Sequence, residues 1–160
     1  MASSGDKKLL GKVALITGGS RGIGRAIAAA YADQGAQVFI CGRDPTEINR
    51  AVAEIRQSGG EIAGVPGDIG NATDVRRIVA AALVRFAAID ILVNNAGILG
   101  PRVAIADYPI ADWEEVLRIN LNGVFFITRE VLPIMLARKG GAVINLTSGV
   151  GRLGKARWGA

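Results

Sequence analysis

The stretch VALITGGSRGIG, residues 13–24, decides the fold, because it joins an apolar run directly to a glycine-rich turn and then to an alanine-rich segment. A strand, a turn and a helix in this order are the context that a phosphate-binding loop requires. Glycines allow close approach of the backbone to a pyrophosphate, and the first helical N–H groups bind the anion. Because residues 17–24 contain four glycines, an ordinary strand–helix turn is the less favoured alternative.

Outward from this stretch, apolar runs of strand length alternate with segments of helical periodicity. The runs are rich in Val, Ile and Leu throughout, which is typical of parallel strands covered on both faces. We therefore expect an α/β fold, a Rossmann-type doubly wound parallel sheet in a three-layer α/β/α arrangement. The five strand candidates are Val13 to Ile16, Val38 to Cys41, Ile62 to Val65, Ile89 to Val93 and Ala142 to Leu146.

Three apolar stripes with a spacing of three or four residues predict helices. In the third, which begins near Ala111, the amide Asn120 lies among apolar neighbours. A buried amide needs hydrogen-bond partners, and such an exception marks either a functional site or a satisfied structural residue. The stripes are Ile23, Ile27 and Tyr31; Val75, Ile78, Val79, Ala82, Leu83 and Phe86; and Trp113, Val116, Leu117, Asn120, Val124 and Ile127.

Length and composition favour a single cytoplasmic domain spanning residues 1–160, of which 1–10 are expected to be flexible. The net charge is +5, but the basic residues are scattered, so solvated surface charge is favoured over nucleic-acid binding. Cys41, the single cysteine, is expected to be a small core residue. Neither a signal-peptide h-region nor an uninterrupted membrane-length apolar run is present, so no membrane partner is expected. The absence of histidine excludes a Ser-His-Asp hydrolase and histidine-based metal sites, and no metal is expected.

The glycine spacing, Gly18, Gly22 and Gly24, resembles the TGxxxGxG motif of the classical short-chain dehydrogenase/reductase family. Two further elements resemble this family, Asp68-Ile69 after the third strand and Asn94-Asn95-Ala96-Gly97 after the fourth. Both follow strand ends, where open α/β sheets bind ligands. The cofactor-binding residues expected from these motifs are Gly18, Ser20, Arg21, Gly22, Ile23, Gly24, Arg43, Asp68, Ile69, Asn95, Ala96 and Gly97.

The end of the second strand favours NADP(H) over NAD(H) as the cofactor. NAD sites usually carry an acid there, whereas NADP needs a cation for its 2′-phosphate. The position that matches the acid is Gly42, and Arg43 follows it. Arg21 and Arg43 could clamp the phosphate through charge-assisted hydrogen bonds. Two alternatives remain: the arginines decorate loops while Asp44 caps the next helix, or Asp44 is recruited for NAD.

The resemblance also implies a catalytic set and a substrate class. Ser148, at the end of the fifth strand, matches the serine that orients an alcohol or carbonyl substrate, with a plain Ser-Gly turn as the alternative. Asn120 matches the asparagine that holds a water in a proton relay. The family's catalytic Tyr-x-x-x-Lys does not occur, since Gly35 and Asp112 follow Tyr31 and Tyr108 at that spacing.

The resemblance therefore implies an NADP(H)-dependent oxidoreductase that transfers hydride between an alcohol or carbonyl and the nicotinamide. The sequence stops where the tyrosine is expected, and we interpret it as truncated before the catalytic helix and substrate region, by a nonsense change or an incomplete gene model. A full-length form is expected to be a homo-oligomer, and the exposed fifth strand to favour association. The alternative is a non-catalytic NADP(H)-binding or interaction protein, or a decayed fragment.

Overall fold

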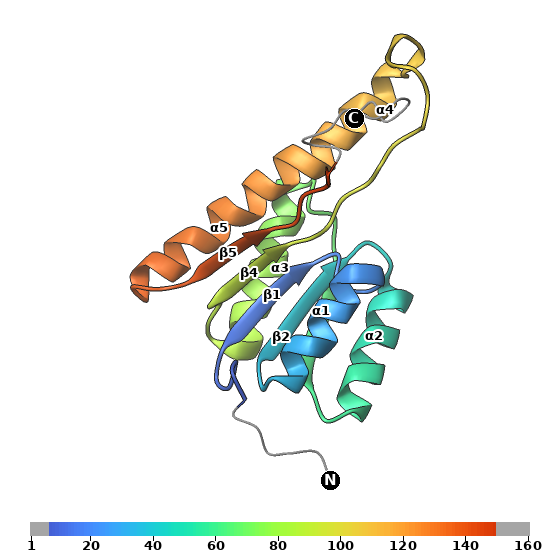
Figure 1. Cartoon of the computed structure of the whole chain (residues 1–160). Helices are drawn as coiled ribbons and strands as arrows, with labels where there is room; N and C mark the ends of the chain where they lie inside the picture. The colour runs from blue at the N-terminus through green and yellow to red at the C-terminus, as the bar shows by residue number, and fades with distance from the viewer. Residues whose placement is uncertain (1–6, 150–160) are drawn as a thin grey trace.

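The computed structural model describes residues 7–149, which form one parallel five-stranded sheet with helices on both faces (Figure 1). The strand order is β3-β2-β1-β4-β5, and every neighbouring pair is parallel. This confirms the predicted doubly wound α/β fold. The strands are β1 (Val13–Thr17), β2 (Gln37–Gly42), β3 (Glu61–Pro66), β4 (Ile91–Asn94) and β5 (Ala142–Asn145).

Helices α1 and α2 cover one face of the sheet, and α3 and α5 cover the other (Figure 1). The connections therefore run outward in opposite directions from β1, and the strand order reverses between β1 and β4. Ligands bind open α/β sheets at such a switch point, beyond the carboxyl ends of the strands. The helices are α1 (Gly22–Asp33), α2 (Pro45–Gln57), α3 (Ala72–Phe86), α4 (Ile110–Leu117) and α5 (Val124–Ala137), with a 3₁₀ turn, η1 (Ile105–Asp107), and a π-helical turn, η2 (Arg118–Gly123).

The core has two parts because the central strands alternate their side chains between the two helical layers. In β1, Leu15 belongs to the cluster beneath α3 and α5, whereas Ile16 belongs to the cluster beneath α1 and α2. Both side chains are fully buried. Burial of one such side chain contributes about 1.5–3 kcal/mol. The need for apolar residues on both faces explains the continuous apolar runs of the sequence.

Two sequence expectations about helix faces were wrong. In α1, Ile23 is 66% exposed and Ile27 and Tyr31 are only partly buried, whereas Gly24, Ala28 and Ala32 face the sheet. The helix lies so close to the sheet that only small residues fit between them. The third predicted helix is not one regular helix, because η2 widens the turn between α4 and α5 and shifts the faces that follow it.

Boundaries also differ slightly from those predicted. Strand β4 begins at Ile91 rather than Ile89, which is buried just before the strand, and β5 ends at Asn145 rather than Leu146. Within the segment expected to be flexible, the described residues form turns, and the Leu9 N–H donates to the Gln34 carbonyl at 3.0 Å.

One long helix among the described residues, Ile110–Ala137, is apolar enough to cross a membrane by length and composition, with a mean hydropathy of 1.3. A core helix of a globular domain passes the same test. Ile127 and Val131 of this helix are fully buried in the cluster shared with α3. One face of the helix therefore packs in this domain, although only 28% of its most apolar 18-residue window is buried, and the absence of a membrane partner stays a prediction.

Candidate functional site

A cavity of about 290 Å³ lies at the carboxyl ends of β1 to β4, at the switch point of the sheet. The structure brings all twelve residues of the predicted cofactor site together around this cavity. Five further residues, which the sequence did not single out as cofactor-binding, complete the lining: Cys41, Gly42, Gly67, Ile98 and Ile119.

The glycine loop fits so closely against the end of β4 that side chains are excluded from it. Gly18 has a φ of +64°, and a Cβ there would lie 2.9 Å from the Cα of Ala96. A Cβ on Gly24 would overlap the Gly18 carbonyl and the Asn95 amide. These glycines bring α1 against the sheet and leave the loop N–H groups and the α1 N-terminus open to the cavity.

Thr17 and Asn95 hold the loop in this position. The buried Thr17 hydroxyl accepts hydrogen bonds from the N–H groups of Asn95 at 3.0 Å and Ala96 at 3.1 Å. The Asn95 Nδ2 donates to the carbonyls of Thr17 at 2.9 Å and Gly18 at 3.2 Å. The glycine-loop side of this cavity is thus built by two strand ends that are distant in sequence, and Thr17 was not predicted to have this role.

A second hollow of about 300 Å³, lined in part by Ser20, Arg21 and Arg43, adjoins the cavity. Among residues 7–149, neither arginine side chain forms an ion pair or a hydrogen bond. Gly42 faces Ser20, because a Cβ on Gly42 would lie 3.0 Å from the Ser20 Oγ. The two guanidinium groups therefore lie at the end of β2 where the sequence predicted a phosphate clamp.

Asp44 is the N-cap of α2. Its Oδ1 accepts hydrogen bonds from the N–H groups of Thr46 at 2.8 Å and Glu47 at 3.3 Å, and Pro45 occupies the first helical position. Capping the helix was one of the alternatives left open by the sequence. Recruitment of Asp44 to a ribose would remove this cap, which costs about 1 kcal/mol.

Arg118 ties the side of the cavity that contains Asp68 to the long helix, and no sequence pattern indicated this contact. Its Nη2 lies 2.7 Å from the Asp68 Oδ2, and its Nε lies 2.6 Å from the Glu115 Oε2. Partial burial raises the pKa of Asp68, but hydrogen bonds from Arg118 and the Gly70 N–H outweigh it and leave the pKa below its usual value. Asp68 is therefore an anion whose orientation is fixed.

The polar residues at the end of β4 point in opposite directions. Whereas Asn95 points to the glycine loop, Asn94 points toward α5 and β5. Its Nδ2 donates to the Thr128 Oγ1 at 3.1 Å and to the Asn145 Oδ1 at 2.8 Å, and its Oδ1 is buried without a partner among the described residues. Asn94 thus ties the end of β4 to α5 and β5 rather than lining the cavity.

Asn120 lies in the π-helical turn η2 and is exposed, so the expectation of a buried amide was wrong. It nevertheless has two partners. Its Oδ1 accepts from the Ile98 N–H at 2.9 Å, and its Nδ2 donates to the Ile98 carbonyl at 2.8 Å. Because Ile98 lines the cavity, Asn120 fixes the segment that follows the Asn94–Gly97 element. Widened turns of this kind are frequent at functional sites.

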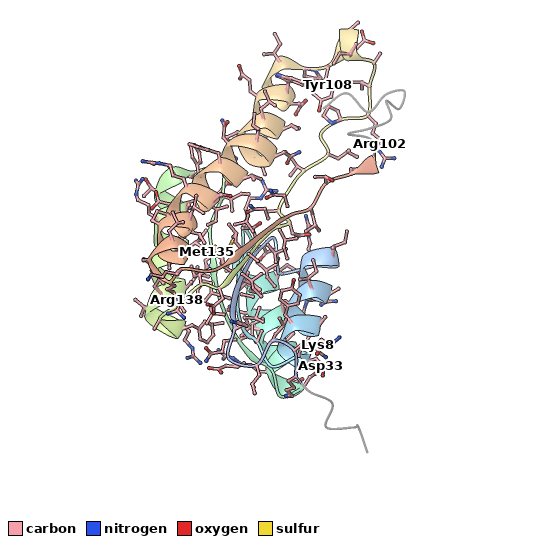
Figure 2. The ribbon with its side chains drawn as sticks, turned by 60° about the vertical axis from the view of Figure 1, so that its left-hand side comes forward. Lys8, Asp33, Arg102, Tyr108, Met135 and Arg138 are labelled. Atoms are coloured by element: carbon pink, nitrogen blue, oxygen red, sulfur yellow. The ribbon has the colours of Figure 1, made fainter. Side chains whose placement is uncertain are left out.

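Ser148 follows β5 at the same edge of the sheet as the cavity but is not among the residues that line it. Of the two tyrosines, Tyr31 lies on α1, and Tyr108 lies just before the projecting end of the long helix. Figure 2 shows Tyr108 at the other end of this helix from Met135 and Arg138. Neither tyrosine lines the cavity. Residues 150–160, the part of the chain nearest the expected catalytic tyrosine, lie outside the described residues.

Cys41 is fully buried in the core, as the sequence predicted. Burial raises the pKa of its thiol to about 12, although a hydrogen bond with the Gly18 backbone acts in the opposite direction. The thiol is therefore protonated at neutral pH and is not a nucleophile. Among residues 7–149, no group of three or more acidic, cysteine or histidine residues could hold a metal ion.

The fold and the cavity define a dinucleotide-binding Rossmann-type domain, because a glycine loop, a helix N-terminus and a switch point coincide. Comparison with known families agrees: the family described as short chain dehydrogenase matches residues 12–160. The chain belongs to the short-chain dehydrogenase/reductase family.

Two curated relatives illustrate its place in the family. The chain is 41% identical over 147 residues to a 3-oxoacyl-[acyl-carrier-protein] reductase of Synechocystis sp. (91% of this chain, 59% of the relative). It is 43% identical over 146 residues to the granaticin polyketide synthase putative ketoacyl reductase 1 of Streptomyces violaceoruber (89% and 53%). The chain thus spans between half and three fifths of these relatives.

Solved structures show the same fold with either cofactor. A variant of actinorhodin polyketide ketoreductase with NADPH has a TM-score of 0.89 and 36% identity over 92% of this chain and 57% of that one. NAD⁺-bound xylitol dehydrogenase has a TM-score of 0.91 and 31% identity over 94% and 58%. The choice between the cofactors therefore depends on the residues of this chain.

Proposed function

We propose that this chain is the cofactor-binding portion of an NADP(H)-dependent oxidoreductase that interconverts an alcohol and a carbonyl compound. One observation carries the proposal: the cavity that runs from the glycine loop opens onto Arg21 and Arg43, and neither guanidinium group forms an ion pair or a hydrogen bond among residues 7–149. A 2′-phosphate supplies the anion that such a pair of guanidinium groups binds.

The residues of the cavity suit such a dinucleotide. The excluded volume at Gly18 and Gly24 leaves backbone N–H groups facing the space that a pyrophosphate needs. On the other side of the cavity, Asp68 and Ile69 would border the adenine. Asn95, Ala96 and Gly97 would border the remainder of the cofactor. Gly42 leaves the ribose side open, since an acid there would meet Ser20 and repel the phosphate.

Bound NADP(H) supplies the hydride donor or acceptor, and the residues of this chain position the reacting groups. Ser148 would donate a hydrogen bond to the substrate oxygen, where negative charge develops during carbonyl reduction. Asn120 retains one N–H and one acceptor site after binding Ile98, and these suffice to hold a water molecule. Neither Tyr31 nor Tyr108 lines the cavity, so neither tyrosine is the residue that transfers the proton.

The names of the relatives support a ketone as the substrate, because several are 3-oxoacyl or ketoacyl reductases. We further propose a cytoplasmic protein, which suits the single buried cysteine, and a homo-oligomeric full-length form. The second candidate is an NADP(H)-binding protein without catalysis. The location of both tyrosines outside the cavity favours it for the 160-residue chain itself.

Titration of the purified chain with NADPH, followed by nicotinamide fluorescence with NADH in parallel, tests this proposal. We expect saturable binding with a lower Kd for NADPH. Equal affinities would remove the argument for the arginine clamp, and the absence of binding to both would overturn the cofactor site. Ketone-dependent oxidation of NADPH by the same sample separates the two candidate functions, since only the enzyme shows it.

A further inference from the structure

The hollow between Arg21 and Arg43 also contains two acids, Asp44 and Glu47. Two positive and two negative side chains give this hollow no net charge, which is unsuited to a dianionic phosphate. Binding of a 2′-phosphate therefore depends on how the two carboxylates are held. Asp44 is fixed as the helix cap, with its Oδ1 on the N–H groups of Thr46 and Glu47.

Glu47 is the carboxylate with a choice of partners. The spacing of Asp44 and Glu47 is that of a capping box, in which the acid three residues into the helix turns back to the N-cap N–H. In the structure, the Glu47 Oε2 instead accepts a hydrogen bond from the Arg50 Nη2 at 2.6 Å, one turn further along α2. This contact pairs the charge of Glu47 with a cation that lies outside the hollow.

Glu47 is the main ion-pair partner of Arg50. The other acid within reach of Arg50 is Glu54, at 3.9 Å, and Glu54 already forms a 2.9 Å ion pair with Arg25 on α1. Arg50 does not line the hollow. We therefore expect any effect of Arg50 on the cofactor to act through Glu47, which does line the hollow.

We propose that Arg50 is a positioning residue for cofactor specificity: by pairing with Glu47, it prevents this carboxylate from opposing a 2′-phosphate between Arg21 and Arg43. The inference rests on the proposed NADP(H) site and identifies a residue that affects its preference for NADPH over NADH. When Arg50 is lost, Glu47 returns to the N-cap and faces the phosphate. NADH carries no 2′-phosphate, so its binding is indifferent to this change.

A double-mutant cycle on the full chain tests the pairing, with NADPH and NADH as probes. Arg50→Ala should weaken NADPH binding about fivefold at low salt, the scale of one surface charge interaction, and leave NADH unchanged. Glu47→Gln should strengthen NADPH binding severalfold. In the Glu47→Gln background, Arg50→Ala should have no further effect, and Arg50→Lys alone should retain most of the wild-type preference.

The control is Arg129→Ala, which removes the same charge from α5, on the other face of the sheet, where the side chain is 68% exposed. An equal loss of NADPH affinity from Arg50→Ala with and without Glu47 would overturn the inference, because Arg50 would then attract the phosphate directly. No loss from Arg50→Ala would also overturn it. A wild-type chain without preference for NADPH would instead overturn the proposed NADP(H) site, and the inference with it.

Discussion

The region around β1 and the region around β5 differ in how completely they bury their apolar side chains. Every residue of β1 is buried, whereas every residue of β5 is exposed, and β5 is an edge of the sheet. Exposed apolar residues continue along the adjoining long helix, at Leu121, Phe125, Leu132 and Leu136. We call the region around β1 the closed region and the region around β5, with the adjoining long helix, the open region. Most of the cofactor cavity belongs to the closed region, and Asn120 and Ser148 belong to the open region.

This difference separates two requirements of the proposed function. The cavity is formed by packing among β1 to β4 and α1, so its geometry depends on close contacts within this chain. The sheet edge at β5, where the proposed substrate-orienting Ser148 follows the strand, lacks comparable burial. We therefore expect substitutions in the closed region to change cofactor binding and folding together, and substitutions in the open region to change association.

The largest effect is expected from Gly24→Val. The new side chain would overlap the Gly18 carbonyl and the Asn95 amide. Overpacking at such a site costs about 3 kcal/mol, the upper end of its usual range. We expect a lower Tm in thermal unfolding and no measurable NADPH binding. Gly140→Ala is the control, because a Cβ there has no atom within 4 Å. A Gly24→Val variant with wild-type Tm would show that α1 does not need this close approach.

Arg43→Glu should have the next largest effect and should act on the cofactor alone. Replacing a cation by an anion removes a charge-assisted hydrogen bond and adds repulsion, together about 3 kcal/mol, so NADPH affinity should fall about 100-fold. NADH affinity should change less than about threefold, since no 2′-phosphate is present. Parallel fluorescence titrations measure both. Equal losses would show that Arg43 supports the fold of the loop rather than the phosphate.

Arg118→Met should have a smaller effect, mainly on stability in acid. The pKa values of Asp68 and Glu115 are lowered, chiefly by Arg118 against partial burial. Carboxylates with lowered pKa values stabilise the fold above their unfolded pKa values and lose this contribution as the pH falls through the folded ones. At neutral pH, the variant should unfold at a slightly lower denaturant concentration than the wild type, because solvent screens these ion pairs.

Chemical denaturation at several pH values checks this prediction. The wild type should lose stability below pH 4.5 to 3.8, the ordinary pKa values of Glu115 and Asp68, and the variant should show a shallower loss. Arg76→Met is the matched control, since the Arg76 guanidinium contacts only the Thr73 hydroxyl among the described residues. Identical acid profiles for wild type and Arg118→Met would show that the ion pairs contribute nothing.

The sequence predicted the elements and the cavity well because both depend on local patterns. Apolar runs identified all five strands, and glycine spacing placed the loop between β1 and α1. It failed on α1, where close packing made Ala28 rather than Ile23 the buried residue. A stripe of small residues, Gly24, Ala28 and Ala32, was the signal that could have shown this face.

Contacts between distant segments were beyond such patterns. Arg118 meets Asp68 across 50 positions, and Asn94 meets Asn145 across 51, so no local spacing indicates either pair. The π-helical turn at Asn120 shifts the helix faces, and a regular 3.6-residue period therefore placed this amide in the core. The polar exception was a correct signal of a special position, but its partner, the Ile98 backbone, lies on another segment.

The smallest effect on folding, and the clearest separation of the two regions, is expected from Phe125→Glu combined with Leu136→Lys. These side chains are 60% and 68% exposed, so their replacement should change the free energy of unfolding by less than about 1 kcal/mol. It should reduce association in light scattering, because it interrupts a contiguous apolar surface. Val84→Lys is the control, since Val84 is 90% exposed but belongs to α3 rather than to the long helix. NADPH affinity should equal that of the wild type, since neither Phe125 nor Leu136 lines the cavity. A loss of cofactor binding would show instead that the two regions are coupled, through links such as the side-chain hydrogen bonds of Asn94 to α5 and β5 or those of Asn120 to Ile98.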